Sequence, residues 1–323
     1  MTRRAAALAL VLALAGTRAR AVELDDGDWK IDLSANLREI LTETRDLAAS
    51  DLPLDPNAPV PLSSMLLSTT RARLQLEARY GDHWSGQLLY DNELYLGTGR
   101  DSLAFRIAEA QGSPTFLDLD QTIVDSRDAT WRHLLYRGWA RYENDDLEVT
   151  LGRQRIALGR GHVWTPSDIF NLIPPLAVEA DQRVGVDAAD GRVRLADDLW
   201  AEAIVAPERH DHDPRSAFRL ELSRSEVDAA VMIAKISRDY VGGFDFATNV
   251  ADAALRGEFT ETWHDQGHPS PTLQAVLSLD YTFPLGTGLY GLVEHFYNQN
   301  VASRSALEDL VRSDTGLTRL AER

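Results

Sequence analysis

The chain has no cysteine, and lysine is almost absent, since only Lys30 and Lys235 are found among its 33 cationic side chains. Without disulfides, a secreted protein of this sequence has to be held together by other interactions. Cationic side chains are outnumbered by acidic ones, and the net charge of -17 argues against nucleic acid as a partner. A chain of 323 residues is long enough for a large soluble core or for a membrane barrel of about a dozen strands.

Sequence motifs of common enzymes and metal sites are also missing. The chain has no P-loop, no zinc-finger spacing and no GxSxG around a serine. His210–Asp213 is the densest group of metal-ligand residue types, but no third, distant ligand is suggested, so a solvated loop tip is the preferred interpretation. Asp25–Asp28 begins like a calcium loop, yet Asn36 stands where the twelfth-position glutamate belongs. We therefore expect no metal, no cofactor and no enzymatic activity.

The N-terminus has the pattern of a secretory leader. Arg3 and Arg4 precede a short apolar stretch, and Ala19-Arg20-Ala21 is an A-x-A cleavage site. The stretch is too short to span about 30 Å of hydrocarbon, and no later segment has about 18 consecutive apolar residues. We predict a signal peptide over residues 1–21 and no transmembrane helix after it.

The mature chain alternates apolar and polar residues over many short segments. Thr70–Tyr80 is the clearest case, with apolar residues such as Leu74 and Leu76 on one face and charged residues such as Arg73 and Glu77 on the other. Successive side chains of a strand point to opposite faces, so this segment separates an apolar environment from an aqueous one. About thirteen such segments, and no convincing interior helix, predict an all-β protein. The predicted strands lie within 31–37, 70–80, 84–91, 134–142, 147–151, 184–195, 199–206, 218–222, 230–236, 244–248, 255–263, 273–281 and 289–297.

The lengths of the connections alternate along nearly the whole chain. Tight turns such as 81–83 and 143–146 are interleaved with long connections such as 38–67, 95–129, 159–183, 207–216 and 264–271. Outer-membrane barrels have short turns at one end and long loops at the other, whereas a soluble sandwich has no reason to sort its connections in this way. The pattern predicts an antiparallel up-and-down transmembrane β-barrel over residues 22–297, in the cell outer membrane.

The predicted barrel has one strand too few. With about thirteen strands, both ends of the barrel domain would not fall on the same side of the membrane, and single-chain bacterial barrels have an even strand number. Residues 298–323 are polar and contain no good strand, so we interpret them as the start of an outer loop that has been cut short. The expectation is a product truncated from 14–18 strands; a miscounted weak strand is the alternative.

A segment in the middle of the chain resembles a known group of proteins. Leu151–Gly161 reads LGRQRIALGRG, Trp164–Asn171 reads WTPSDIFN, and Asp181–Asp187 reads DQRVGVD. These motifs resemble a strand–loop–strand element of porin-like outer-membrane proteins of Gram-negative bacteria, in the broad company of the alginate-export barrels. The resemblance implies a barrel and an outer-membrane location, but it names no substrate, and the missing C-terminal strand departs from the group.

Arginines on the polar faces of the strands are the first candidate site. A charge on the lipid face costs about 2–4 kcal/mol at the membrane midplane, so these arginines should look into the lumen. Two interpretations remain open: an anion-attracting ladder, or a network of salt bridges with inward carboxylates. The predicted pore-lining residues are Arg71, Arg73, Arg79, Arg137, Arg141, Arg153 and Arg155. Their candidate partners in a network are Asp91, Glu93, Glu148, Glu202, Glu221, Glu258, Asp280 and Glu294.

The connection near residues 159–183 is the second candidate site. Its prolines make it stiff and unsuited to a strand, and its many apolar residues need burial. We predict that it folds into the mouth of the lumen as a constriction, where Asp168 and Asp181 could pair with the arginines. The predicted constriction residues are Trp164, Asp168, Phe170, Asp181 and Arg183.

The function predicted from these patterns is a porin-like channel for diffusion of small hydrophilic solutes, anions among them. Its partners would be outer-membrane lipid and the solutes, with a homo-oligomer left open. A surface adhesion or assembly barrel with partner-binding loops is one alternative. An outer-membrane hydrolase and a secreted soluble β-protein are further ones, although no His–Ser pairing can be read from the spacing.

Overall fold

The computed structural model describes residues 10–47, 62–102, 105, 115–126, 128–171, 185–208, 213–265, 271–286 and 288–299. These residues form one antiparallel sheet of fifteen strands. The strands are β1 (Leu10–Asp26), β2 (Trp29–Leu47), β3 (Leu62–Tyr80), β4 (Trp84–Leu96), β5 (Asp120–Asp125), β6 (Ala129–Glu143), β7 (Leu147–Gln154), β8 (Val186–Ala196), β9 (Leu199–Ala206), β10 (Arg215–Ser223), β11 (Val227–Ile236), β12 (Asp239–Val250), β13 (Ala253–Trp263), β14 (Thr272–Phe283) and β15 (Leu289–Asn298). A short 3-10 helix, η2 (Thr98–Asp101), follows β4.

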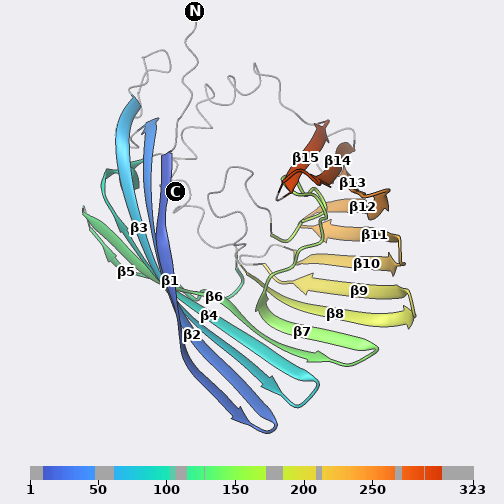
Figure 1. Ribbon diagram of the computed structural model, residues 1–323, viewed down its shortest axis with the longest axis horizontal. Coiled ribbons are helices and arrows are strands. Elements are labelled where there is room, and N and C mark those ends of the chain that lie inside the picture. The colour runs from blue at the N-terminus through green and yellow to red at the C-terminus, as the bar shows by residue number, and fades with distance from the viewer. Residues whose placement is uncertain are drawn as a thin grey trace, which may run out of the picture.

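The strands follow one another through the sheet in chain order. Each pairs antiparallel with the next, except that β6 pairs with both β4 and β7, and β5 is attached to β6 as a side branch. The sheet curves strongly, so that it has a concave and a convex face (Figure 1). Strands β1 and β15 stand at opposite ends of the strand order, and the described sheet is not closed. The predicted antiparallel up-and-down topology is confirmed, whereas a closed barrel is not what the structure describes.

The predicted alternation of side chains is confirmed in the strands. On β11, Val231 and Ile233 are exposed, while Met232 and Ala234 between and beside them are buried. On β3, Leu74 and Leu76 are exposed, and Arg71 is buried on the opposite face. Because the period is two and paired residues of neighbouring strands point to the same side, one face of the sheet carries exposed apolar side chains from β2 to β15.

The strand count of the prediction was wrong by two. Each of the thirteen predicted segments overlaps a strand, and the structure adds β1 and β5. Strand β5 escaped prediction because its six residues are nearly all exposed and it forms hydrogen bonds with β6 alone. Strand β1 begins at Leu10, within the residues assigned to the leader, whose removal stays a prediction. The tail after residue 299 lies outside the described residues.

The two ends of the sheet differ in the length of their connections, as predicted. At one end lie the turns 27–28, 81–83, 144–146, 197–198, 224–226, 251–252 and 284–288. At the other end the connections are longer, apart from the two-residue turn Ser237–Arg238, which joins β11 to β12 with Ser237 at a φ of 53°. Among the described residues, no helix is both long and apolar enough to cross a membrane.

Candidate functional site

The candidate site is the concave face of the sheet together with the segment that follows β7. This segment, Arg155–Asn171, leaves the end of β7 and runs over the concave side of the later strands (Figure 1). The structure thus places the first half of the predicted constriction segment inside the curve of the sheet. Its second half, with Asp181 and Arg183, lies outside the described residues.

Apolar side chains of the segment provide one part of its attachment. Ile156, Leu158, Ile169 and Phe170 are buried in one cluster with small and apolar residues from the concave faces of β8–β12. These strand residues are Val186, Ala188, Ile204, Ala206, Ala217, Met232, Ala234 and Val241. Burial of each large side chain stabilises the attachment by about 1.5–3 kcal/mol. The prediction that the apolar residues of this connection need burial is confirmed for Ile169 and Phe170, whereas Val163 is exposed.

A carboxylate of β13 provides the second part. Glu258 is almost completely buried and accepts hydrogen bonds from the backbone N–H groups of Arg160, Gly161 and Ser167. Hydrogen bonds to a charged acceptor are about twice as strong as neutral ones. The backbone has to approach closely for this: a Cβ at Gly159 would lie 2.6 Å from Thr165 Cβ and 3.0 Å from Glu258 Oε1. Glycine at this position therefore permits the turn around Glu258.

A carboxylate of β15 holds the next three residues. Glu294 accepts hydrogen bonds from the backbone N–H groups of His162, Val163 and Trp164, at 2.8, 3.0 and 2.9 Å. The indole of Trp164 stacks on the ring of Phe296, with 5.4 Å between the centroids and 7° between the planes. Glu258 and Glu294 together fix the segment where it is least apolar.

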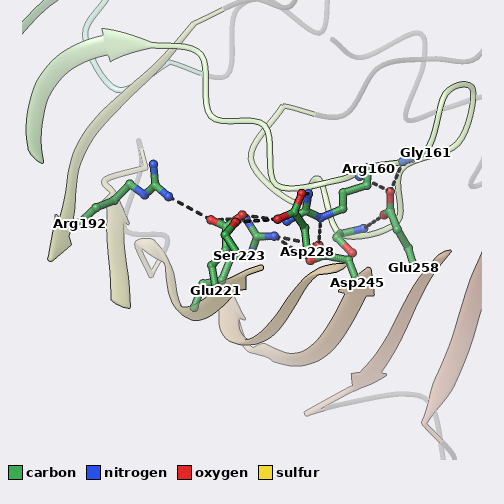
Figure 2. A network of polar contacts seen from close by, with 10 residues as sticks. Arg160, Gly161, Arg192, Glu221, Ser223, Asp228, Asp245 and Glu258 are labelled. Carbon is green, nitrogen blue, oxygen red and sulfur yellow. Dashed lines mark hydrogen bonds and ion pairs between the residues drawn. The ribbon is translucent and has the colours of Figure 1, made fainter. Parts of the chain in front are cut away.

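The side chain of Arg160 joins the segment to a network of ionic groups on the concave face (Figure 2). Its guanidinium donates to Asp245 of β12 and, at 2.8 Å, to Glu221 of β10. Burial acts to lower the pKa of Arg160, but the hydrogen bond and the charge of Asp245 outweigh it, and the pKa is raised. The same carboxylates accept from two further arginines, Arg219 on Asp245 and Arg192 on Glu221. Arg160 thus stays charged and paired.

Four of the predicted arginines gather on the concave side of β3–β7. Arg73 forms two hydrogen bonds of 2.6 Å with Asp91, and its guanidinium carbon lies 4.1 Å from the ring centroid of Tyr136. Arg71 and Arg137 also lie within electrostatic range of Tyr136. Arg155 lies close enough to Arg137 for the two charges to repel. These four residues form one cationic cluster on the concave face.

Two other predicted arginines, Arg141 and Arg79, lie apart from that group. Arg141 pairs with Glu148 at 3.2 Å and donates to Thr150. Arg79 lines a pocket of about 580 Å³ at the end of the sheet that carries the short turns. Lys30, Asp32 and Glu77 are among the other residues that line this pocket. The predicted arginines therefore do not form a single ladder.

Arg153 was assigned to the wrong face. The alternation along β7 puts it in the row of Leu147 and Leu151, which are exposed on the convex face. Its charge is not exposed there, because the chain around Leu117 covers it: Arg153 pairs with Asp187 at 3.0 Å and donates to the carbonyl of Leu117. The predicted common face of Arg153 and Arg155 is lost because Arg155 lies beyond the end of β7, where strand alternation stops.

Among the predicted constriction residues, Trp164 and Phe170 make the contacts described above. Asp168 instead forms a hydrogen bond within the segment. Asp168 is buried, and its carboxylate accepts from the backbone N–H of Asn171 at 3.3 Å. The side chain of Asn171 in turn accepts from the N–H of Ile156, which ties the two ends of the described segment together. Asp168 thus shapes this segment.

Strand alternation predicts Glu258 and Glu294 only as partners for arginine. It does not predict that they accept hydrogen bonds from backbone N–H groups, or that Arg160 and Asp245 lie at the centre of the network. Strand alternation does put Glu258 and Asp245 on the polar face, and β12 and β13 pair these two residues directly. No pattern in the sequence indicated which segment would lie against them.

The described residues contain no group of three or more His, Asp or Glu side chains that could hold a metal ion. His210–His212 lie outside them, and Asp213 pairs with Lys235 at 2.7 Å. No model of a known protein family matches the chain, and no curated protein matches it.

Proposed function

We propose that this chain is a porin-like protein of the outer membrane, whose convex face contacts lipid and whose concave face lines a path for small hydrophilic solutes. The observation that carries the proposal is the division of one sheet into two faces. The convex face exposes large apolar side chains from β2 to β15, whereas the concave face carries the ionic network. Exposed apolar surface of this extent needs an apolar environment.

Two further features support the proposal. The segment Arg155–Asn171 lies over part of the concave face, where a constriction would have to lie (Figure 1). The leader and the resemblance to porin-like proteins, both read from the sequence, agree with an outer-membrane location. Passage would be governed by the size of the opening beside this segment and by the charges of the concave face.

The contacts favour weak ion selectivity over a strong preference for anions. Arg73, Arg160 and Arg219 each pair with a carboxylate at 3 Å or less. Paired charges largely cancel at a distance, so they attract a passing ion only weakly. The salt-bridge network considered in the sequence analysis thus has more support than the anion ladder.

Planar-bilayer conductance of the purified full-length chain tests the proposal. We expect steady ohmic steps and a small reversal potential in a salt gradient. A folded protein that runs at different positions on gels before and after heating, yet never conducts, would contradict the channel. In that case a surface adhesion barrel would be the better interpretation.

A further inference from the structure

A polar pocket lies between the start of the inward segment and strands β7–β10. It has a volume of about 340 Å³, which falls within the usual range of small-molecule sites. Four guanidinium groups and four carboxylates line it, together with backbone of the segment. These ionic residues are Arg155, Arg160, Arg192 and Arg219, and Glu148, Asp190, Glu202 and Glu221.

Two of these carboxylates, Asp190 and Glu202, have few hydrogen-bond donors close to them. Asp190 Oδ1 is buried and has no hydrogen-bond partner among the described residues. Glu202 is 9% exposed, and the cation nearest to it is the Nε of Arg192, 3.9 Å away, which is beyond hydrogen-bond distance. The strand register brings them together, because Asp190 pairs with Ile204, two residues along β9 from Glu202. Buried carboxylates normally have close donors, so this side of the pocket is suited to a cationic group.

On the cationic side, Arg155 differs from the other three arginines. Arg160, Arg192 and Arg219 each make a close ion pair with Glu221 or Asp245. Arg155 is exposed at the pocket, and no carboxylate pairs with it among the residues that the structure describes. Its charged neighbour is Arg137, which repels it. A carboxylate supplied by a solute would relieve this repulsion and form charge-assisted hydrogen bonds.

We propose that this pocket binds a zwitterionic solute, with its carboxylate on Arg155 and its ammonium group on Asp190 and Glu202. This inference rests on the proposed channel function and names the class of solute that the channel selects. A simple anion would leave Asp190 and Glu202 without a donor, and a simple cation would leave Arg155 beside Arg137. Only a solute with both charges satisfies both sides of the pocket.

Block of the single-channel current by small solutes tests the inference. The probes are glycine and 4-aminobutyrate, which differ in the distance between their charges. Acetate, butyrate, methylammonium and butylammonium are the matched controls with one charge each. We expect at least one zwitterion to interrupt the current at a concentration where its two singly charged relatives have no effect. A channel that conducts but is blocked only by the anions, only by the cations or by none of the probes would overturn the zwitterion site while leaving the channel intact.

Two variants locate the site within the channel. Arg155→Gln and Asp190→Asn should each weaken block by the zwitterion about tenfold, because each removes one charge-assisted contact. Arg79→Gln and Asp32→Asn are the matched controls, since both residues line the separate pocket near the short-turn end. Block should be unchanged in these controls. Equal weakening in all four variants would show that general charge, and not this pocket, governs the block.

Discussion

At the scale of single residues, small side chains decide whether the inward segment can reach the sheet. Gly161 donates its N–H to Glu258, and a Cβ at this position would overlap the carbonyl oxygen of Trp164 and lie 3.2 Å from Glu258 Oε1. Overlap with backbone cannot be relieved by a change of rotamer. The segment would have to move away from the carboxylate that anchors it.

Gly161→Ala should therefore destabilise the folded protein by about 1–3 kcal/mol, the usual cost of forcing extra atoms into a packed site. The measurement is the urea midpoint of unfolding in lipid vesicles. Gly191→Ala is the control, because nothing lies within 4 Å of a Cβ built there. Equal midpoints for the two variants would mean that the segment is not held as described.

Residue-scale predictions from the sequence were correct where strand alternation applied. Arg73 and Asp91 were both assigned to the polar face, and the pairing of β3 with β4 puts them directly opposite each other. The prediction that Arg153 faces the lumen was wrong, because it rested only on the cost of placing a charged side chain on the lipid face. In the structure the position of Arg153 in β7 decides the face, and its partners there are the carboxylate of Asp187 and the carbonyl oxygens of Leu135 and Leu117.

At the scale of elements, the inward segment depends on acceptors from two distant strands. Glu258 of β13 and Glu294 of β15 each accept three backbone N–H groups of this segment. These contacts span about a hundred residues or more of sequence, so no local pattern predicts them. The glycines, the proline and the apolar residues of the segment indicated only that it is irregular and in need of burial.

Replacement of both anchors, Glu258→Gln and Glu294→Gln, should raise the single-channel conductance and its noise. Each exchange keeps the size of the side chain but weakens the acceptor, at a cost of about 1–3 kcal/mol to the attachment. Glu261→Gln, at an exposed position of β13, is the matched control and should conduct like the parent chain. If the double variant also conducts like the parent, the segment does not narrow the path.

At the scale of the whole molecule, the apolar convex face is the property that the proposed function depends on. Val231 lies in the middle of β11, is 51% exposed, and pairs with Leu220 and Phe244 of the neighbouring strands. If this face contacts lipid, a charge here must be moved into hydrocarbon. In water the same change would cost little.

Val231→Arg should reduce the stability of the protein in lipid vesicles by about 2–4 kcal/mol. Glu226→Arg, in the exposed turn between β10 and β11, is the control and should have little effect. The fraction that folds can be measured by the change of gel mobility on heating. A normally folding Val231→Arg protein would show that the convex face does not contact lipid.

The sequence by itself determined the all-β class, the antiparallel succession of thirteen of the strands, most of the polar and apolar rows and the sorting of short and long connections. These depend on local rules, because side chains alternate along a strand and tight turns need few residues. The tertiary structure decided the path of the inward segment, the partners of the arginines, and the placement of β1 and β15 at opposite ends of the described sheet. These depend on contacts between residues far apart in the sequence, and alternation along a single strand carries no information about them.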